Sequence, residues 1–292
     1  MQKAGMMTML KAIDVSAVQG VIDWQKVKKA GISAAMVKAS QGYSEQTVGL
    51  RLFADSKFLK NVLGAAAAGI HVGAYHYLTA RNVLEAQEEA KLFLATLMPV
   101  KDKIVLWAAV DVESRFLPDD RTLLTQIVKT FCKEVEEGGF IPCIYTNPSF
   151  LRYRLGDVSD YRLWLAYWTG IDALTKAPSD STAKAYTGQY SNVVLWQWGR
   201  YKPGAVSGIS VDVDGDTVIK DIYASGSDAI SLGNRVRLKS DAVYISGKPV
   251  PLWVRVLTLY VREIRGDTIT VSIIKSGDIT GAVNRRYIEK VK

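Results

Sequence analysis

The chain has 292 residues, 48% of them hydrophobic and 23% charged, which suits one large domain plus a small one and excludes a single small domain. Only two cysteines are present, so a disulfide framework is excluded, and Cys132 and Cys143 are expected as buried free thiols. The net charge is +8, and residues from Asp228 onward hold 12 Lys and Arg against 6 Asp and Glu. Such a basic segment favours polyanionic partners or serves solubility alone.

Short β-rich segments alternate with helical patterns through the first half of the chain. Strands are predicted over residues 11–14, 33–38, 70–77, 104–111 and 140–145. Helices are predicted over residues 24–30, 85–97 and 121–137, with Asp23 as the N-cap of the first. Because strands that alternate with helices form parallel sheets through right-handed crossovers, this half is expected to be α/β.

The pattern is less regular in the second half. Further strands are predicted over residues 163–167, 193–198 and 209–213, with only a short helix near 216–222. Eight strands, with helices mostly between the first five, predict an α/β fold, an irregular TIM-like β/α barrel over residues 1–223, whose chemistry lies at the carboxyl ends of the strands. Small residues over 224–231 predict a linker, and β-rich runs over 232–292 predict a small all-β barrel.

Targeting signals and metal-ligand patterns are not found in the sequence. No apolar run reaches the length of a membrane span, and the N-terminal segment has no small-residue cleavage site, so no signal peptide is expected. His71 and His76 are the only histidines, and with the two cysteines they show no metal-ligand spacing. Both histidines are interpreted first as structural, and no cofactor is expected.

The segment IVLWAAVDVE is a nearly continuous apolar strand that ends in two carboxylates. Asp111 and Glu113 are two residues apart, so on a strand both side chains point to the same face, at the mouth of the barrel. Two acids close together beside apolar walls raise the pKa of one of them, and a protonated acid beside an ionised one suits glycosidic bond cleavage. The alternative is an acid pair that caps the next helix or pairs with Arg115.

Two further acids are predicted to converge with this pair. Asp14 ends the first strand and Asp212 lies near the end of the last, and these strands are neighbours in a closed barrel. Asp214 and Asp216 follow and suggest a calcium loop, but the glycine is misplaced for an EF-hand loop and no Glu stands at the twelfth position. A calcium loop is therefore rejected.

Aromatic side chains accompany the acids. Six of the seven Trp precede the predicted linker, and Tyr75 and Tyr77 alternate on one predicted strand. Others lie on later strands, namely Trp164, Trp168, Trp196 and Trp198. Aromatic rings stack on the apolar faces of sugars, although for any single ring the barrel core is the alternative.

Eight short segments resemble, in their order along the chain, the motifs of glycoside hydrolase family 25, the Chalaropsis-type lysozymes common in phages of Gram-positive bacteria. They are DVSAVQGVIDW, MVKASQG, GAYHY, DVE, YTN, WLAYW, WQW and GISVDVD. The resemblance implies an irregular β/α barrel that cleaves the β-1,4 bond between N-acetylmuramic acid and N-acetylglucosamine in peptidoglycan, without metal or organic cofactor. The alternatives are a wall-binding phage protein with an inactive barrel, and another glycosidase on a similar barrel.

The resemblance also implies roles for single residues. By position, Glu113 resembles the general acid and Asp111 its partner. Asp14 and Asp212 resemble the acids of the first and last strands. Five aromatic residues fall where the family lines its sugar groove, namely Tyr75, Tyr77, Tyr145, Trp168 and Trp198. The family often has K-A-T-E-G where this chain has KASQG, so Gln41, a candidate substrate-binding residue, keeps the hydrogen bonding but removes a charge.

The tail carries a second resemblance. The segments LGNRVRLKSDAVYISGKPVPLWV and ITGAVNRRYI resemble the SH3-like modules attached to phage lysins and amidases. Barrel, linker and module together resemble a phage or prophage endolysin. This implies a monomer made in the host cytoplasm and acting at the cell wall after holin-type release. The implied partners are peptidoglycan and, through the module, anionic wall polymers, with neither nucleic acid nor membrane.

Overall fold

The computed structural model describes residues 9–42, 52–170, 173–219, 230, 233–265, 268–275 and 278–291. Contacts between residues divide the chain into two compact units, an N-terminal unit, Met1–Lys220, and a C-terminal unit, Asp221–Lys292. The predicted linker over residues 224–231 lies outside the described residues except for Ile230.

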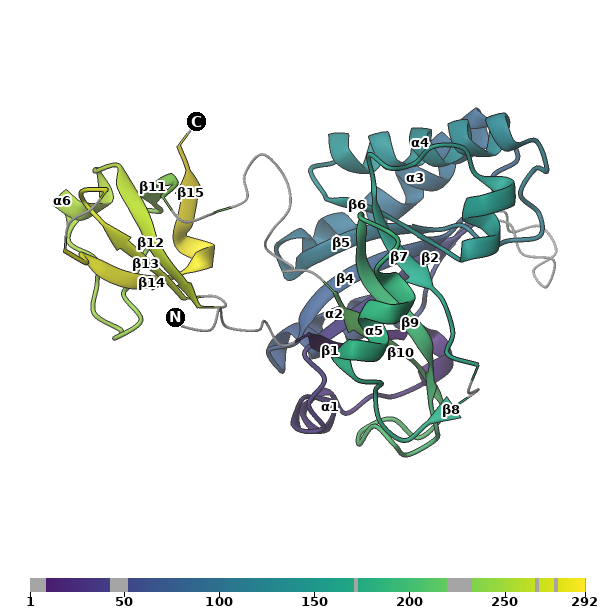
Figure 1. The fold of residues 1–292 in the computed structure, drawn as a ribbon, viewed down its shortest axis with the longest axis horizontal. Coiled ribbons are helices and arrows are strands. Elements are labelled where there is room, and N and C mark those ends of the chain that lie inside the picture. Colours follow the sequence, from purple (N-terminus) through teal and green to yellow (C-terminus); the bar gives the residue numbers. More distant parts are fainter. Residues whose placement is uncertain are drawn as a thin grey trace. The chain divides into compact units, whose positions relative to one another are not determined.

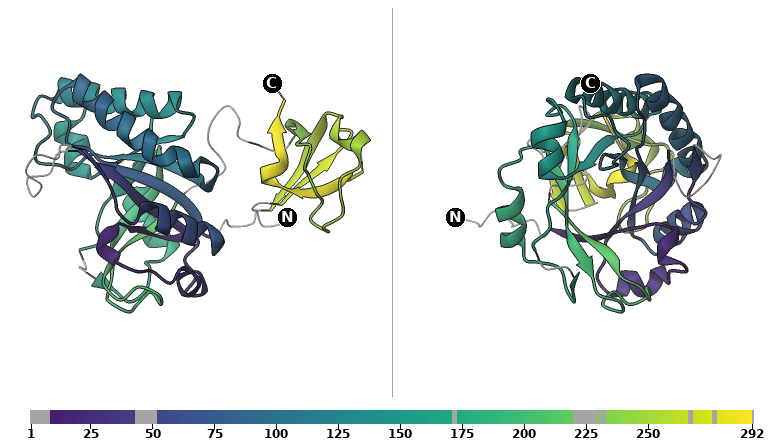
Figure 2. Two further views of the ribbon diagram at one scale, coloured as in Figure 1. Left: turned by 180° about the vertical axis from the view of Figure 1, so that it is seen from behind. Right: turned by 90° about the vertical axis from the view of Figure 1, so that its right-hand side faces the viewer.

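Eight strands of the N-terminal unit form a closed barrel (Figures 1 and 2). They are β1 (Leu10–Val15), β2 (Ala34–Gln41), β4 (His71–Tyr77), β5 (Ile104–Asp111), β6 (Pro142–Thr146), β7 (Arg162–Ala166), β9 (Val193–Tyr201) and β10 (Val213–Val218). The order around the barrel is β1-β10-β9-β7-β6-β5-β4-β2, and pairing of β1 with β2 closes it. Two short strands, β3 (Phe53–Ala54) and β8 (Ala173–Leu174), pair with β2 and β9. The predicted irregular β/α barrel is confirmed.

The strand β10 runs against its neighbours, which corrects the expectation of a parallel barrel. The other pairs around the barrel are parallel, but β10 is antiparallel to both β1 and β9. Asp14 therefore pairs with Asp214, and Leu10 pairs with Val218. The mouth of the barrel, where β1 and β5 end, is thus the place where β10 begins.

The limits of β10 also differ from the sequence prediction. A strand is predicted over residues 209–213 and a helix near 216–222, but the strand is Val213–Val218. Its two acids, Asp214 and Asp216, hide the alternation of apolar residues by which a strand is usually found. A shift in register within β10 interrupts the pattern further.

Helices cover the outside of the barrel, and most connect successive barrel strands (Figure 1). Those among the described residues of the N-terminal unit are α1 (Trp24–Lys29), α2 (Phe58–Ala67), α3 (Val83–Leu97), α4 (Arg121–Glu137) and α5 (Asp180–Thr187). Asp23 and Asp120 cap α1 and α4, because each side chain accepts a backbone N–H three residues further on. Within the described ranges, no helix combines the length and the apolar character that crossing a membrane requires.

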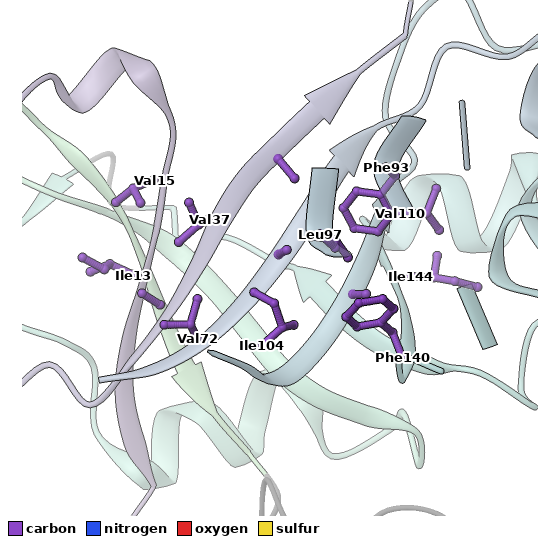
Figure 3. Close-up of a cluster of buried hydrophobic side chains, with 14 of the residues drawn as sticks. Ile13, Val15, Val37, Val72, Phe93, Leu97, Ile104, Val110, Phe140 and Ile144 are labelled. Carbon is purple, nitrogen blue, oxygen red and sulfur yellow. The ribbon is translucent and has the colours of Figure 1, made fainter. Parts of the chain in front are cut away.

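Apolar side chains fill the layer between the barrel strands and the outer helices (Figure 3). Ile13 and Val15 of β1 lie in this layer, together with Phe93 and Leu97 of α3. Because successive side chains on a strand point to opposite faces, Asp14 between the two β1 residues points into the barrel. The same alternation that builds the core therefore directs the polar side chains of the site inward.

The C-terminal unit is built around one antiparallel sheet. Its strands, in spatial order, are β14 (Gly281–Asn284), β13 (Thr268–Ser272), β12 (Leu259–Arg265), β11 (Arg235–Leu238) and β15 (Ile288–Lys290). A short helix, α6 (Leu252–Arg255), precedes β12. Val236, Val261, Ile269 and Val271 are among the side chains of its own apolar core. Strands therefore dominate this unit, as the sequence predicts.

Candidate active site

The acid pair of the DVE motif lies at the mouth of the barrel. Asp111 is the last residue of β5, and Glu113 follows two positions later. The N–H of Val112 donates to the carbonyl of Tyr145 on β6, so strand pairing continues past Asp111. Asp111 is 6% exposed, whereas Glu113 is exposed. Of the two carboxyl groups, Glu113 is therefore the one that is open to a substrate.

The surroundings favour a proton on this pair. Burial raises the pKa of Asp111 well above its ordinary value, and the charge of Glu113 raises it further. Burial among the protein atoms of the mouth, and then the charge of Asp214, raise the pKa of Glu113 although solvent reaches its side chain. The charge of Lys38 opposes both shifts without cancelling them. One acid can hold a proton while the other is ionised.

Lys38 of β2 brings a positive charge to the mouth, and although it lies in the MVKASQG motif, no role is predicted for it from the sequence. Its Nζ donates to Oε1 of Gln41 at 2.7 Å and lies 5.3 Å from the ring centroid of Tyr77. The charges of Asp111 and Glu113 act on it, although burial lowers its pKa. Gln41 is partly exposed, and its hydrogen bond with Lys38 holds its side chain near the acids. A lysine within an otherwise apolar strand is the signal that points to it.

A second group of acids faces the first, because β10 and β5 lie on opposite sides of the eight-stranded ring. Asp14 and Asp216 are buried, and Asp214 is partly exposed. Burial raises the pKa of Asp14 well above its ordinary value, and the charges of Asp214 and Asp216 add to the effect. Burial likewise raises the pKa of Asp216 to about 8 and that of Asp214 to about 6. This group also retains protons near neutral pH.

Asp212 lies beside the second acid group, where its charge raises the pKa of Asp214, but it pairs with Arg200 and does not converge with the buried acids, which corrects the sequence prediction in part. It precedes β10, and its Oδ2 pairs with Nη1 of Arg200 at 2.6 Å, with 44% of its side chain exposed. Because β10 is antiparallel to β1, the acids that lie near Asp14 are those within β10 and not those that precede it. Asp214 and Asp216 therefore occupy the place that the sequence assigns to Asp212.

Four of the five predicted groove aromatics lie around the mouth. The rings of Tyr75 and Tyr145 meet the ring of Trp164 on β7 edge-on, with centroids 5.7 and 4.6 Å apart. Tyr75 and Tyr77 are partly exposed, whereas Tyr145 is nearly buried. Trp168, just beyond the end of β7, is 42% exposed and is the most accessible of the four.

The fifth predicted groove aromatic, Trp198, is in the core, so a sugar cannot reach it. The side chain is fully buried and packs against Tyr201, and a Cβ at Gly215 would lie 2.1 Å from its ring. Alternation along β9 places Trp196 and Trp198 outside the barrel and Gln197 inside. The WQW motif therefore contributes Gln197 to the candidate site. The sequence signal for this residue is a single polar side chain between two Trp.

His76 is structural, in agreement with its interpretation from the sequence. It lies outside the barrel between β4 and α3, where Nδ1 is 2.8 Å from Ser40 Oγ and Nε2 is 2.8 Å from Glu89 Oε2. The Glu89 carboxylate also accepts the N–H and the hydroxyl of Thr79. Burial lowers the pKa of His76, so the ring is neutral and its hydrogen bonds are satisfied.

Two further kinds of candidate site are a surface hollow and a set of metal ligands. A hollow of about 900 Å³ runs along α4 beside Lys129, Lys133 and Tyr161, and its lining includes no residue of either acid group. Among the described residues, no three His, Cys, Asp or Glu side chains are placed to hold a metal ion. Cys132 and Cys143 are buried and free, as predicted. The mouth therefore remains the candidate active site.

The sequence of this barrel matches a known protein family. Residues 13–205 match the sequence profile of glycosyl hydrolases family 25. The chain belongs to glycosyl hydrolase family 25. The matched range includes Asp14, Asp111 and Glu113 and ends before Asp214 and Asp216.

Curated relatives of this family 25 chain share part of its length. The autolytic lysozyme of Clostridium acetobutylicum is 28% identical over 225 residues, which is 77% of this chain and 60% of that lysozyme. The uncharacterised protein YegX of Escherichia coli K12 is 31% identical over 166 residues, 54% of this chain and 56% of its own length. The chain thus spans less than two thirds of the length of these relatives.

Solved structures share the family 25 barrel. The CTP1L endolysin has a TM-score of 0.56 at 24% identity, and the match covers 74% of this chain and 68% of the endolysin. The lysozyme of Streptomyces coelicolor has a TM-score of 0.54 at 24% identity, covering 72% of this chain and 92% of that structure. These likenesses establish the fold of the N-terminal unit.

Proposed function

We propose that this chain is a peptidoglycan hydrolase, an N-acetylmuramidase that cleaves the β-1,4 bond between N-acetylmuramic acid and N-acetylglucosamine. The observation that carries the proposal is the accessible Glu113 beside the buried Asp111, both with a raised pKa. Family membership and the lysozyme relatives support the choice of substrate.

In the proposed mechanism Glu113 is the general acid. It donates its proton to the glycosidic oxygen as the bond to the anomeric carbon breaks, and the departing sugar leaves with a hydroxyl group. Positive charge then develops on the remaining ring. The ionised members of the two acid groups, on either side of the mouth, stabilise this charge. Water then adds to the anomeric carbon, and its proton returns to the Glu113 carboxylate.

The bond that is cut can be determined directly. Purified peptidoglycan is digested, the products are reduced with borohydride, and the fragments are analysed by mass spectrometry. New reducing ends on N-acetylmuramic acid are expected. Reducing ends on N-acetylglucosamine would indicate a glucosaminidase, and new free amino groups would indicate a peptidase, and either result would contradict the proposal.

We also propose that the C-terminal unit is an SH3-like wall-binding module. Two observations support this role, the excess of basic residues after Asp228 and the five-stranded antiparallel sheet. Leu252, Trp253 and Val256 on and beside α6 are 75%, 58% and 66% exposed, so an apolar surface is available as well as charge. Basic residues attract the anionic polymers of Gram-positive walls.

The biological setting is part of the same proposal. The combination of a family 25 barrel with a wall-binding module fits a monomeric phage or prophage endolysin, made in the host cytoplasm and released to the wall through holin pores. The structural likeness to the CTP1L endolysin is in keeping with this setting. Lysis from within is the test: co-expression with a holin in a Gram-positive host should release cell contents, and expression of the chain alone should not.

A further inference from the structure

Gln197 of β9 connects three groups at the mouth that come from different strands. The side chain is 4% exposed. Its Oε1 accepts the indole N–H of Trp168 at 3.0 Å and the hydroxyl of Tyr145 at 3.0 Å. Its Nε2 donates to Oδ2 of Asp14 at 2.9 Å. One buried amide thus joins β6, the segment after β7, and β1.

The chemistry of the partners fixes which way the amide points. The indole N–H of Trp168 can only donate, so it must face the carbonyl oxygen of Gln197. The NH2 group then faces Asp14, where Oδ2 accepts from Nε2. A flipped amide would lose both hydrogen bonds. The orientation of Gln197 is therefore imposed by its partners, and neither carbonyl nor NH2 group is free to turn.

The Trp168 ring is exposed and yet held in place. Exposed side chains on a surface usually sample several rotamers, and immobilising one costs conformational entropy. Here the bond to Gln197 anchors the indole by its nitrogen while 42% of the side chain stays open to solvent. Beside it lies a hollow of about 360 Å³ that Tyr167 and Tyr186 also line. A fixed, exposed ring of this kind is suited to stacking on a sugar.

The Tyr145 hydroxyl links the same amide to the general acid. Tyr145 has one hydroxyl proton, which it can donate to Oε1 of Gln197, an atom that cannot donate in return. The hydroxyl also contacts the carboxyl of Glu113, and this contact lowers the pKa of Glu113 against the larger effect of burial. This contact favours the ionised form of Glu113, which accepts from the hydroxyl, so the one proton of Tyr145 lies between Gln197 and Glu113. Gln197 thereby holds the hydroxyl that contacts the proposed general acid.

We propose that Gln197 is a positioning residue, which holds the sugar platform Trp168, the hydroxyl of Tyr145 and the carboxyl of Asp14 in one network across the mouth. The proposal rests on the proposed muramidase function. Gln197 itself is not assigned contact with the reacting atoms. It fixes the distance between the ring that binds the glycan and the acids that cleave it, and small errors in that distance are costly to the rate.

Two substitutions separate positioning from packing. Gln197→Met keeps the volume and removes all three hydrogen bonds. Gln197→Glu keeps the shape and depends on pH: when protonated it can still accept through its carbonyl and donate to Asp14, but when ionised it faces Asp14 as a second carboxylate. Burial and the neighbouring acid raise the pKa of the introduced carboxyl group, so this variant is compared with wild type over a series of pH values. The control is Gln126→Met, at an exposed site on α4.

The measurements are kcat and KM on soluble glycan fragments at several pH values, each divided by the wild-type value. Gln197→Met should lower kcat/KM at least about tenfold at every pH, with KM raised and kcat reduced. Gln197→Glu should approach wild type at low pH and fall to the level of Gln197→Met as pH rises. The control should follow wild type. A ratio for Gln197→Glu that does not change with pH, or a Gln197→Met variant with wild-type kcat and KM, would overturn the proposal.

An indole ¹⁵N–¹H spectrum tests the network without catalysis. The Trp168 signal is assigned by its loss in Trp168→Phe, and it should shift and exchange faster with solvent in Gln197→Met. An unmoved signal would count against the network even if activity fell. If the wild-type chain does not hydrolyse peptidoglycan, the proposed function fails. The spectrum then tests by itself whether Gln197 holds Trp168 in the hydrogen-bond network. Should Gln197→Met not fold, the pH dependence of Gln197→Glu carries the test.

Discussion

Asp111 and Glu113, the two carboxyl groups at the end of β5, differ most in their access to solvent. This difference is the reason for proposing Glu113 as the proton donor. Because Glu113 is accessible and has a raised pKa, we expect Glu113→Gln to lower turnover of soluble glycan by at least about 100-fold. Glutamine keeps the shape and hydrogen bonding of the side chain but cannot donate the proton. Turnover is measured by the appearance of reducing ends.

The matched control for this prediction is Asp119→Asn, which neutralises an acid whose side chain is 98% exposed. Its turnover should stay near that of wild type. Both variants should also keep the wild-type unfolding midpoint, since Glu113 is not part of the core. Wild-type turnover in Glu113→Gln would show that another group donates the proton.

Asp216 gives a prediction about stability and pH. Burial raises its pKa to about 8 in the folded chain, against about 3.9 for an unfolded aspartate. Between these values the folded chain binds a proton that the unfolded chain has released, so stability falls as pH rises, by up to about 1.4 kcal/mol per pH unit. Asp216→Asn keeps the bond from Trp164 but cannot ionise.

The experiment compares urea unfolding of wild type and Asp216→Asn from pH 4 to pH 9. The variant should gain stability relative to wild type as pH rises toward 8, and the difference should level off above that. Because Asp14 shares this environment, part of the effect belongs to the pair. Two stability curves that stay parallel over the whole range would show that Asp216 is ionised in the folded chain.

At the scale of elements, a buried network fastens α3 to the barrel. Glu89 of α3 accepts from Thr79 and contacts His76 of β4. Glu89→Ala would leave these buried groups unpaired, so we expect the free energy of unfolding to drop by about 2–4 kcal/mol. Glu88→Ala, at the exposed neighbouring position, should change it by less than about 0.5 kcal/mol. Equal losses in both variants would contradict this account.

How well an element could be predicted depended on the clarity of its periodicity. The strand β5 and the helix α4 were predicted with their observed limits, because one is a continuous apolar run and the other has apolar residues at helical spacing. The strand β10 was not, because aspartates occupy its inward positions. Periodicity in a sequence indicates which apolar side chains are buried. Polar site residues that point into the barrel interrupt this pattern.

The site was predictable in part for the same reason. Asp14, Asp111 and Glu113 stand at strand ends in the sequence and at the mouth in the structure. The direction of β10, by contrast, follows from pairing with β1 and β9, and without it Asp212 looked equivalent to Asp214. Pairing across the barrel is a long-range property that a single sequence does not reveal.

At the scale of the whole molecule, the two units each have a core of their own, so their functions can be separated. A shortened chain that ends at Tyr223 should cleave soluble glycan fragments at the wild-type rate. On intact cells it should lose much of its activity, most visibly at low salt, because tethering raises the effective concentration on an insoluble wall. Lysis of cells and cleavage of fragments are measured side by side. Full lysis of cells by the shortened chain would deny the C-terminal unit a role.

The wall-binding role has its own measurement. The C-terminal unit, fused to a fluorescent protein, should label host walls and be released as salt rises, because screening weakens attraction between its basic residues and anionic polymers. Trp253→Ala provides the contrast, since it removes an exposed apolar ring without changing charge. Labelling that resists salt but is lost in Trp253→Ala would place recognition on the apolar surface.

The reversed direction of β10 has a consequence for how such chains are assembled. Since Leu10 pairs with Val218, the barrel's first and last strands have their outer ends together, on the side away from the acids. Segments can thus be joined before β1 or after β10 at the end of the barrel opposite the acids. Either segment can therefore be exchanged, during evolution or by an engineer, without altering the strand ends that hold the acids.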